Sequence, residues 1–210
     1  MATSIRVGIG GVSRGTERAS RILMPAFALL LLILFGYSLT MPGIGESLRF
    51  MFSPDFSKLT AASVLEAMGH SFFTLSLGMG VMIVYGSYLR KQDSIFQSGL
   101  IVVLADTAIA LVAGVTIFSI VFSAGQEPAA GPGLVFVTLP GLFANLPFSI
   151  LWAIIFFLLL AFAALTSGIS ILEVPVSFFV ERLQLPRGAA TLAVGGLIFL
   201  IGIACALSFG

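Results

Sequence analysis

The sequence predicts an all-α integral membrane protein, and its composition and the pattern of its apolar residues both lead to that fold class. Hydrophobic residues make up 59% of the chain and charged residues only 9%, whereas an ordinary soluble domain carries about 25% charged residues. The apolar residues gather in five runs, each long enough for the roughly 20 residues that a helix needs to cross a bilayer. Because backbone groups inside lipid must find hydrogen-bond partners within the protein, we expect helices rather than strands.

The five predicted spans follow one another along the chain, and we expect them to form a single transmembrane domain over residues 1–210. They cover residues 22–41, 62–89, 95–123, 148–180 and 189–209. The first and last are almost purely apolar, whereas the second, third and fourth contain polar interruptions. These interruptions are where we look for function.

Basic residues lie mostly in alternate loops, which predicts how the chain is oriented in the membrane. One set of loops contains Arg6, Arg14, Arg18, Arg21, Arg90, Lys91, Arg182 and Arg187, and the other set contains only Arg49 and Lys58. Lys and Arg favour the cytoplasmic side of a membrane. We therefore expect a multi-pass protein of the cell inner (plasma) membrane, with its N-terminus cytoplasmic and its C-terminus extracytoplasmic.

Two longer connections then fall on the outer side. Residues 42–59 have room for a short interfacial helix. Residues 125–147 are rich in Gly and Pro around an apolar middle, so this loop either folds back onto the protein as a lid or lies on the membrane surface.

Charge and cysteine content exclude several classes of function. The formal net charge is +1, which gives no indication of nucleic-acid binding. Cys205 and His70 are each the single residue of their type in the chain, so neither an intrachain disulfide nor a zinc centre is expected. We expect no cofactor.

The stretch SFFTLSLGMG, residues 71–80, interrupts the second span with hydroxyl side chains and glycines. One interpretation is a helix kinked by glycine, in which Thr74 and Ser76 bond back to their own helix. The other is an unwound segment, which is tolerated in a membrane only where its free backbone groups line a cavity or bind a ligand.

Polar groups also interrupt the third and fourth spans. Asp106 lies in the third span, and since the predicted spans contain no Lys or Arg, it would need a cation or a proton, unless the helix end reaches further into water. Ala163, Thr166, Ser167 and Ser170 share one face of the fourth span. Such a face either packs against another helix or offers hard oxygen ligands, which suit Na⁺.

These stretches together resemble a known family. FFTLSLGMGVMIVYGSYLRK, LADTAIALVAG, GLVFVTLP and AALTSGISILE, with RGTERASRILMP before them, resemble the neurotransmitter:sodium symporters, which include the bacterial leucine transporter. The resemblance implies a fragment covering the fifth to ninth transmembrane helices of an inverted-repeat fold. It also implies that the second helix of this chain is broken near residues 75–80.

The resemblance implies sodium-coupled symport of a neutral amino acid, and therefore a transporter rather than an enzyme. The sodium ligands would be Thr74 and Asp106 in a first site, and the Ala163 carbonyl, Thr166 and Ser167 in a second. The substrate pocket would be lined by Phe73, Thr74, Ser76, Met79, Ser167 and Ile171. An inner gate would contain Ser87, Tyr88, Glu173 and Glu181.

Two further expectations depend on this resemblance. Asp106 stands where the leucine transporter has asparagine, and Ala110 where it has a glutamate. Because residues four apart share a helix face, Asp106 keeps a negative charge nearby and chloride should not be required.

The missing transmembrane helices of a full-length protein would complete the sites. The alternative function is a non-transporting membrane scaffold or accessory fragment, or a nonfunctional truncation product.

Overall fold

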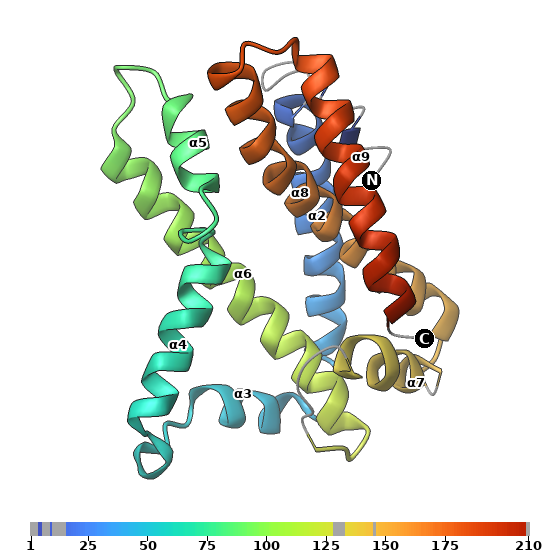
Figure 1. The fold of residues 1–210 in the computed structure, drawn as a ribbon. Helices are drawn as coiled ribbons and strands as arrows, with labels where there is room; N and C mark the ends of the chain where they lie inside the picture. Colours follow the sequence, from blue (N-terminus) through green and yellow to red (C-terminus); the bar gives the residue numbers. More distant parts are fainter. Residues whose placement is uncertain (1–3, 6–8, 10–15, 128–132, 145, 209–210) are drawn as a thin grey trace. The chain divides into compact units, whose positions relative to one another are not determined.

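The computed structural model describes residues 4–5, 9, 16–127, 133–144 and 146–208, and the described part is helical with no strand. Four helices are long and apolar enough to cross a membrane: α2 (Glu17–Ser38), α6 (Ile95–Ser123), α8 (Ser149–Arg182) and α9 (Arg187–Ser208) (Figure 1). Only 6% to 22% of the most apolar stretch of each is buried, so lipid or further protein must cover the rest. The all-α membrane fold class is confirmed.

The remaining elements are shorter. Two helices divide the second predicted span, α4 (Ala61–Thr74) and α5 (Val81–Ser87). The connections contain α3 (Ile44–Phe52), the 3₁₀ turn η2 (Phe56–Lys58), the π-helical turn η3 (Leu134–Thr138) and α7 (Leu139–Phe143).

The chain divides into two compact units, each described here by itself. Unit 1 consists of Met1–Pro25, Phe72–Ile95 and Phe162–Gly210, and unit 2 of Ala26–Ser71 and Phe96–Ala161. The boundaries fall inside α2, α4, α6 and α8, so these helices contribute to both units.

Unit 2 has an apolar core to which the expected outer loop contributes. Leu139 and Phe143 of α7 are 0% and 1% exposed and pack in one cluster with Leu34 of α2 and Phe156 of α8. The described part of the loop at 125–147 therefore packs against protein, because burial of these side chains is worth about 1.5–3 kcal/mol each. Close by, the Tyr37 and Trp152 rings stack with their centroids 3.9 Å apart.

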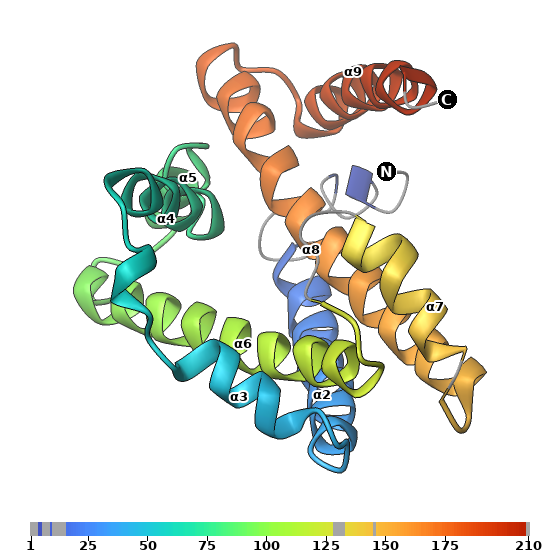
Figure 2. The same cartoon turned by 90° about the horizontal axis from the view of Figure 1, so that it is seen from below.

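Helix α3 lies along α6 within unit 2 (Figure 2), in the loop where we expected a short interfacial helix. The Gly43 N–H donates to Ser123 Oγ at 2.9 Å, and Ser47 Oγ donates to the Val115 carbonyl at 3.1 Å. Gly43 allows this approach, since a Cβ there would lie 2.5 Å from the Ser123 nitrogen.

The core of unit 1 lies where α9 packs on the C-terminal half of α8. Leu172 and Val176 of α8 meet Ala190 and Val194 of α9, and all four side chains are buried. This packing fixes the part of α8 that carries most of the predicted site residues.

Candidate functional site: a helix break and a buried ion pair

The second predicted span is broken where the sequence indicates. Helix α4 ends at Thr74 and α5 begins at Val81, with turns between them. The end of α4 is closed by two bonds, from the Ser76 N–H to the Phe73 carbonyl and from the Leu77 N–H to the Phe72 carbonyl, each 3.0 Å. This pair of bonds is the Schellman motif, which stops a helix and turns the chain away from it.

Ser76 occupies the left-handed position of that motif, with φ of 56°. Glycine is the usual residue there, and a side chain raises the cost of the left-handed conformation by about 1–2 kcal/mol. Backbone strain of this kind gathers at functional sites. The strain therefore marks the break as a candidate site independently of the resemblance.

The break leaves main-chain donors without helical partners. Among the described residues, the N–H groups of Gly78, Met79 and Gly80 donate to no backbone carbonyl. Gly80 has φ of 74°, and a Cβ there would lie 3.3 Å from Val174 Cγ1 on α8. Uncompensated N–H groups are costly in an apolar medium, so they favour a ligand with acceptor oxygens.

Helix α8 presents the oxygens predicted for the second sodium site. Thr166 Oγ1 donates to the Phe162 carbonyl at 3.0 Å and to the Ala163 carbonyl at 2.9 Å, which places two of the predicted ligand oxygens side by side. Ser167, the next residue, is exposed. Three hard oxygen donors within one turn are suited to an alkali cation rather than to a soft metal.

Pro175 modifies the same helix about two turns further on. It lies inside α8, and since proline has no N–H it cannot make the usual bond to the carbonyl four residues earlier. That carbonyl belongs to Ile171, a predicted substrate residue with a side chain that is 47% exposed.

Two of the predicted inner-gate residues are in contact, and a third residue joins them. Glu173 is 2% exposed; its Oε1 accepts a hydrogen bond from the Tyr88 hydroxyl at 3.0 Å, and its Oε2 lies 2.5 Å from the Arg187 guanidinium. Both carboxylate oxygens are therefore satisfied, as a buried charge requires. Ser87 donates instead to the Val84 carbonyl, and Glu181 is exposed at the end of α8.

The pairing of Arg187 with Glu173 was not predicted from the sequence, where Arg187 serves only to indicate the orientation of the chain. The signal was available, because a carboxylate inside a predicted span needs a partner. Glu173 lies in the fourth predicted span, and the basic residues that follow this span before the next are Arg182 and Arg187.

The first predicted sodium site draws on both units. Thr74 belongs to unit 1, and Asp106 lies half-buried on α6 in unit 2. Phe73 and Met79, predicted to line the substrate pocket, are 70% and 36% exposed. The composition of this site and of the pocket stays a prediction.

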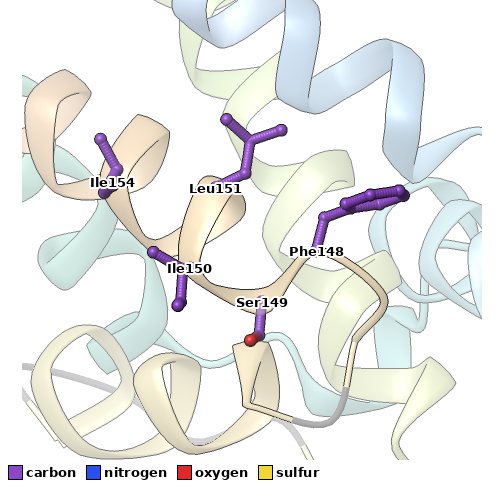
Figure 3. A pocket seen from close by; sticks show the side chains of 5 residues that line it. All are labelled: Phe148, Ser149, Ile150, Leu151 and Ile154. Atoms are coloured by element: carbon purple, nitrogen blue, oxygen red, sulfur yellow. The ribbon is translucent and has the colours of Figure 1, made fainter.

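An open hollow lies elsewhere, at the start of α8 (Figure 3). It has a volume of about 480 Å³ and is lined by Phe148, Ser149, Ile150, Leu151 and Ile154. The lining is apolar except for one hydroxyl, and the predicted substrate residues are not part of it. We do not assign the substrate to this hollow.

Comparison with known proteins agrees with this geometry. Residues 2–210 match the Sodium:neurotransmitter symporter family. An uncharacterized sodium-dependent transporter, YhdH, of Bacillus subtilis is 42% identical over 100% of this chain and 47% of its own length. Another from Haemophilus influenzae is 41% identical over 91% of this chain and 42% of its own length.

A solved structure gives the same result. The crystal structure of MhsT in complex with L-phenylalanine matches with a TM-score of 0.88 and 45% identity, over 100% of this chain and 48% of that one. The chain thus spans about half the length of the relatives it matches. It belongs to the sodium:neurotransmitter symporter family, a family of multi-pass membrane transporters.

Proposed function

We propose that this chain carries ion- and substrate-binding residues of a symporter that couples the entry of a neutral amino acid to Na⁺. The observation that carries the proposal is the helix break at residues 75–80, where, among the described residues, the N–H groups of Gly78, Met79 and Gly80 donate to no backbone carbonyl. Main-chain groups at a break in a membrane helix are suited to an amino-acid substrate and its coupling ions.

A neutral, apolar substrate fits the side chains beside the break. Phe73, Met79 and Ile171 are apolar, and Thr74 and Ser76 supply hydroxyls. The relative MhsT was crystallised with L-phenylalanine, which supports the same substrate class. Ser167 completes the pocket from α8.

Sodium would bind at two sites. The second site takes the Ala163 carbonyl and the Thr166 and Ser167 hydroxyls, of which the first two lie 2.9 Å apart. The first site takes Thr74 and Asp106. Asp106 would serve as both ligand and counter-charge, so chloride would not be required.

The Tyr88–Glu173 contact, with Ser87 and Glu181, would close the cytoplasmic end of the pathway in the outward-facing state. The chain would lie in the cell inner membrane with its N-terminus inside. The groups that complete each site would come from the part of the protein that corresponds to the rest of the relatives' length.

Transport tests the proposal directly. The full-length product of the reading frame that encodes this chain is reconstituted into liposomes, and uptake of labelled L-phenylalanine and L-leucine is measured with an inward Na⁺ gradient. Potassium in place of sodium is the ion control, and labelled L-glutamate the substrate control. We expect uptake of the neutral amino acids that requires Na⁺. Failure of both Na⁺-driven uptake and Na⁺-dependent substrate binding would favour the alternative, a scaffold or a nonfunctional product.

Two variants test the ion sites. Thr166→Val keeps the shape and removes an oxygen ligand, so Na⁺ affinity should fall about tenfold or more, whereas Thr166→Ser should retain it. Replacement of chloride by gluconate should leave uptake unchanged while Asp106 is intact. A large loss of uptake in gluconate would show that the charge argument is wrong.

A further inference from the structure

Helix α5 is held to α8 by two tyrosine hydroxyls, both within unit 1. The Tyr85 hydroxyl donates to Ser170 Oγ at 3.2 Å, and the Tyr88 hydroxyl donates to Glu173 at 3.0 Å. Tyr85 lies on α5, and Tyr88 follows three residues later, directly after the end of that helix. Their partners lie three residues apart on α8, a spacing that places both partners on one helix face. The two phenol rings also meet edge to face, with centroids 6.5 Å apart. The Tyr88 contact belongs to the ion-pair cluster, but the Tyr85 contact has no role in the site described so far.

Ser170 connects Tyr85 to the oxygens of the second sodium site. Its hydroxyl accepts from Tyr85 and donates to the Thr166 carbonyl at 3.1 Å. The Thr166 hydroxyl in turn donates to the carbonyl oxygens of Phe162 and Ala163, at 3.0 and 2.9 Å. Two sets of hydrogen bonds, linked by the covalent bonds between the carbonyl and the hydroxyl of Thr166, therefore join α5 to two of the proposed sodium ligands.

Sodium would change the bonds at one end of this series. A cation bound to the Ala163 carbonyl and to Thr166 Oγ1 competes with the hydrogen bond between them, so the Thr166 proton turns wholly to the Phe162 carbonyl. This orders the turn that presents the Thr166 carbonyl to Ser170.

The hydrogen bond between Tyr85 and Ser170 is long. Its two hydroxyl oxygens lie 3.2 Å apart, whereas 2.5–3.0 Å is usual for a bond between hydroxyl oxygens. A small movement of α5 is enough to form or break this bond.

We propose that Tyr85 and Ser170 are positioning residues that couple occupancy of the second sodium site to the docking of α5 on α8. The proposal rests on the function proposed above. Because coupling between two equilibria is reciprocal, docking of α5 through Tyr85 must raise Na⁺ affinity. Removal of either hydroxyl should therefore weaken Na⁺ binding although neither residue touches the ion.

The chain offers matched controls for both residues. Ser177 is buried on the same helix and donates to the Val174 carbonyl at 2.9 Å, so Ser177→Ala removes a serine hydroxyl that stays within its own helix. Tyr37 stacks on Trp152 in unit 2, so Tyr37→Phe removes a tyrosine hydroxyl that belongs to the other unit. Ser170→Thr keeps the hydroxyl that Ser170→Ala removes.

The test is equilibrium binding of radioactive Na⁺, alone, to the purified full-length product. Tyr85→Phe and Ser170→Ala should each weaken Na⁺ binding about three- to tenfold, the worth of one net hydrogen bond. Because the two residues act in one series, the double variant should be no weaker than the weaker single variant. Ser170→Thr should restore affinity, and Ser177→Ala and Tyr37→Phe should bind Na⁺ as the wild type does.

The outcomes separate this coupling from the proposed function. A purely structural role for Tyr85 would lower the melting temperature without changing Na⁺ affinity, and that result would overturn the coupling. So would fully additive losses in the double variant. Absence of saturable Na⁺ binding by the wild type would overturn the proposed function, and this inference with it.

Discussion

Ser76 shows at the scale of one residue how the break is made. Its left-handed backbone, with φ of 56°, ends α4, and the N–H groups of Gly78, Met79 and Gly80 beyond it donate to no backbone carbonyl among the described residues. Glycines stand two and four residues further on, yet the strained position itself carries a hydroxyl side chain. We infer that the side chain is kept for its polar group, at some cost in stability.

Ser76→Gly should therefore make the protein more stable and weaken its binding of substrate. The left-handed conformation costs a side chain about 1–2 kcal/mol, and the extra freedom of glycine when unfolded returns about 0.5–1 kcal/mol of this. We expect a net gain of about 0.5–1 kcal/mol in thermal unfolding and a loss of substrate affinity. Ser76→Ala, which keeps the strain, should lose affinity without that gain. A Ser76→Gly protein less stable than the wild type would refute the strain argument.

At the scale of an element, the packing of α3 against α6 depends on Gly43 but not on Gly45. A Cβ at Gly43 would lie 2.5 Å from the Ser123 nitrogen and 2.7 Å from the Ser119 carbonyl oxygen, whereas a Cβ at Gly45 would meet nothing within 4 Å. These two obstructing atoms at Gly43 are backbone atoms, so they cannot move aside as a flexible side chain would.

Alanine at these two positions should have opposite effects on unfolding. Gly43→Ala should destabilise the protein by about 1–3 kcal/mol, as overpacking does. Gly45→Ala should stabilise it by about 0.5–1 kcal/mol, because alanine is the better residue inside a helix. Thermal unfolding measures both, and cleavage by protease in residues 53–60 should increase only in the Gly43 variant. Equal stability of the two variants would contradict the close packing of α3.

The Glu173–Arg187 pair joins α8 to α9, and removal of one partner should be costly. Arg187→Met leaves a buried carboxylate with the Tyr88 hydrogen bond alone among the contacts described for it. Loss of one partner from a buried pair costs about 3–5 kcal/mol. Arg182→Met, which changes an exposed arginine at the end of α8, is the control and should have little effect in thermal unfolding.

A double variant distinguishes the loss of the ion pair from the loss of side-chain packing. Glu173→Gln with Arg187→Met leaves neither charge buried, so it should recover part of the stability that Arg187→Met loses. If the double variant is the least stable of the three, the destabilisation does not come from an unpaired charge.

For the whole molecule, the distribution of basic residues predicts which loops face the cytoplasm. Gln126 and Gln92 lie in loops of opposite predicted side, and both are exposed. On a Cys205→Ala background of the full-length product, a cysteine at Gln126 should react with an impermeant maleimide from outside intact cells. A cysteine at Gln92 should react only after the membrane is opened. The reverse pattern would invert the topology.

The sequence predicted the parts of this fold that depend on local composition. Helix α6 has the same bounds as the third predicted span, and the break lies where glycines and hydroxyls interrupt the second. The bounds of α6 and the position of the break both depend on residues that are close together in the sequence.

Contacts between distant residues could not be predicted in this way. The Glu173–Arg187 pair depends on the turn between α8 and α9, and the Tyr85–Ser170 bond on how α5 packs against α8. That Ser76 takes a left-handed conformation, as Gly80 does, was also beyond the sequence, since Gly78 was a better candidate than Ser76 on conformational grounds. The two residues predicted for the first sodium site, Thr74 and Asp106, fall in different units, so this site stays a prediction.

The length of α8 has a consequence for the surrounding lipid. Its 34 residues extend about 51 Å at 1.5 Å per residue, whereas the hydrocarbon core of a bilayer is about 30 Å thick. To fit within the core, the helix would have to tilt by about 54°, beyond the roughly 40° seen in membrane proteins. One end must therefore emerge into the headgroups. A thicker or thinner bilayer would therefore change how much of α8 lies outside the hydrocarbon core.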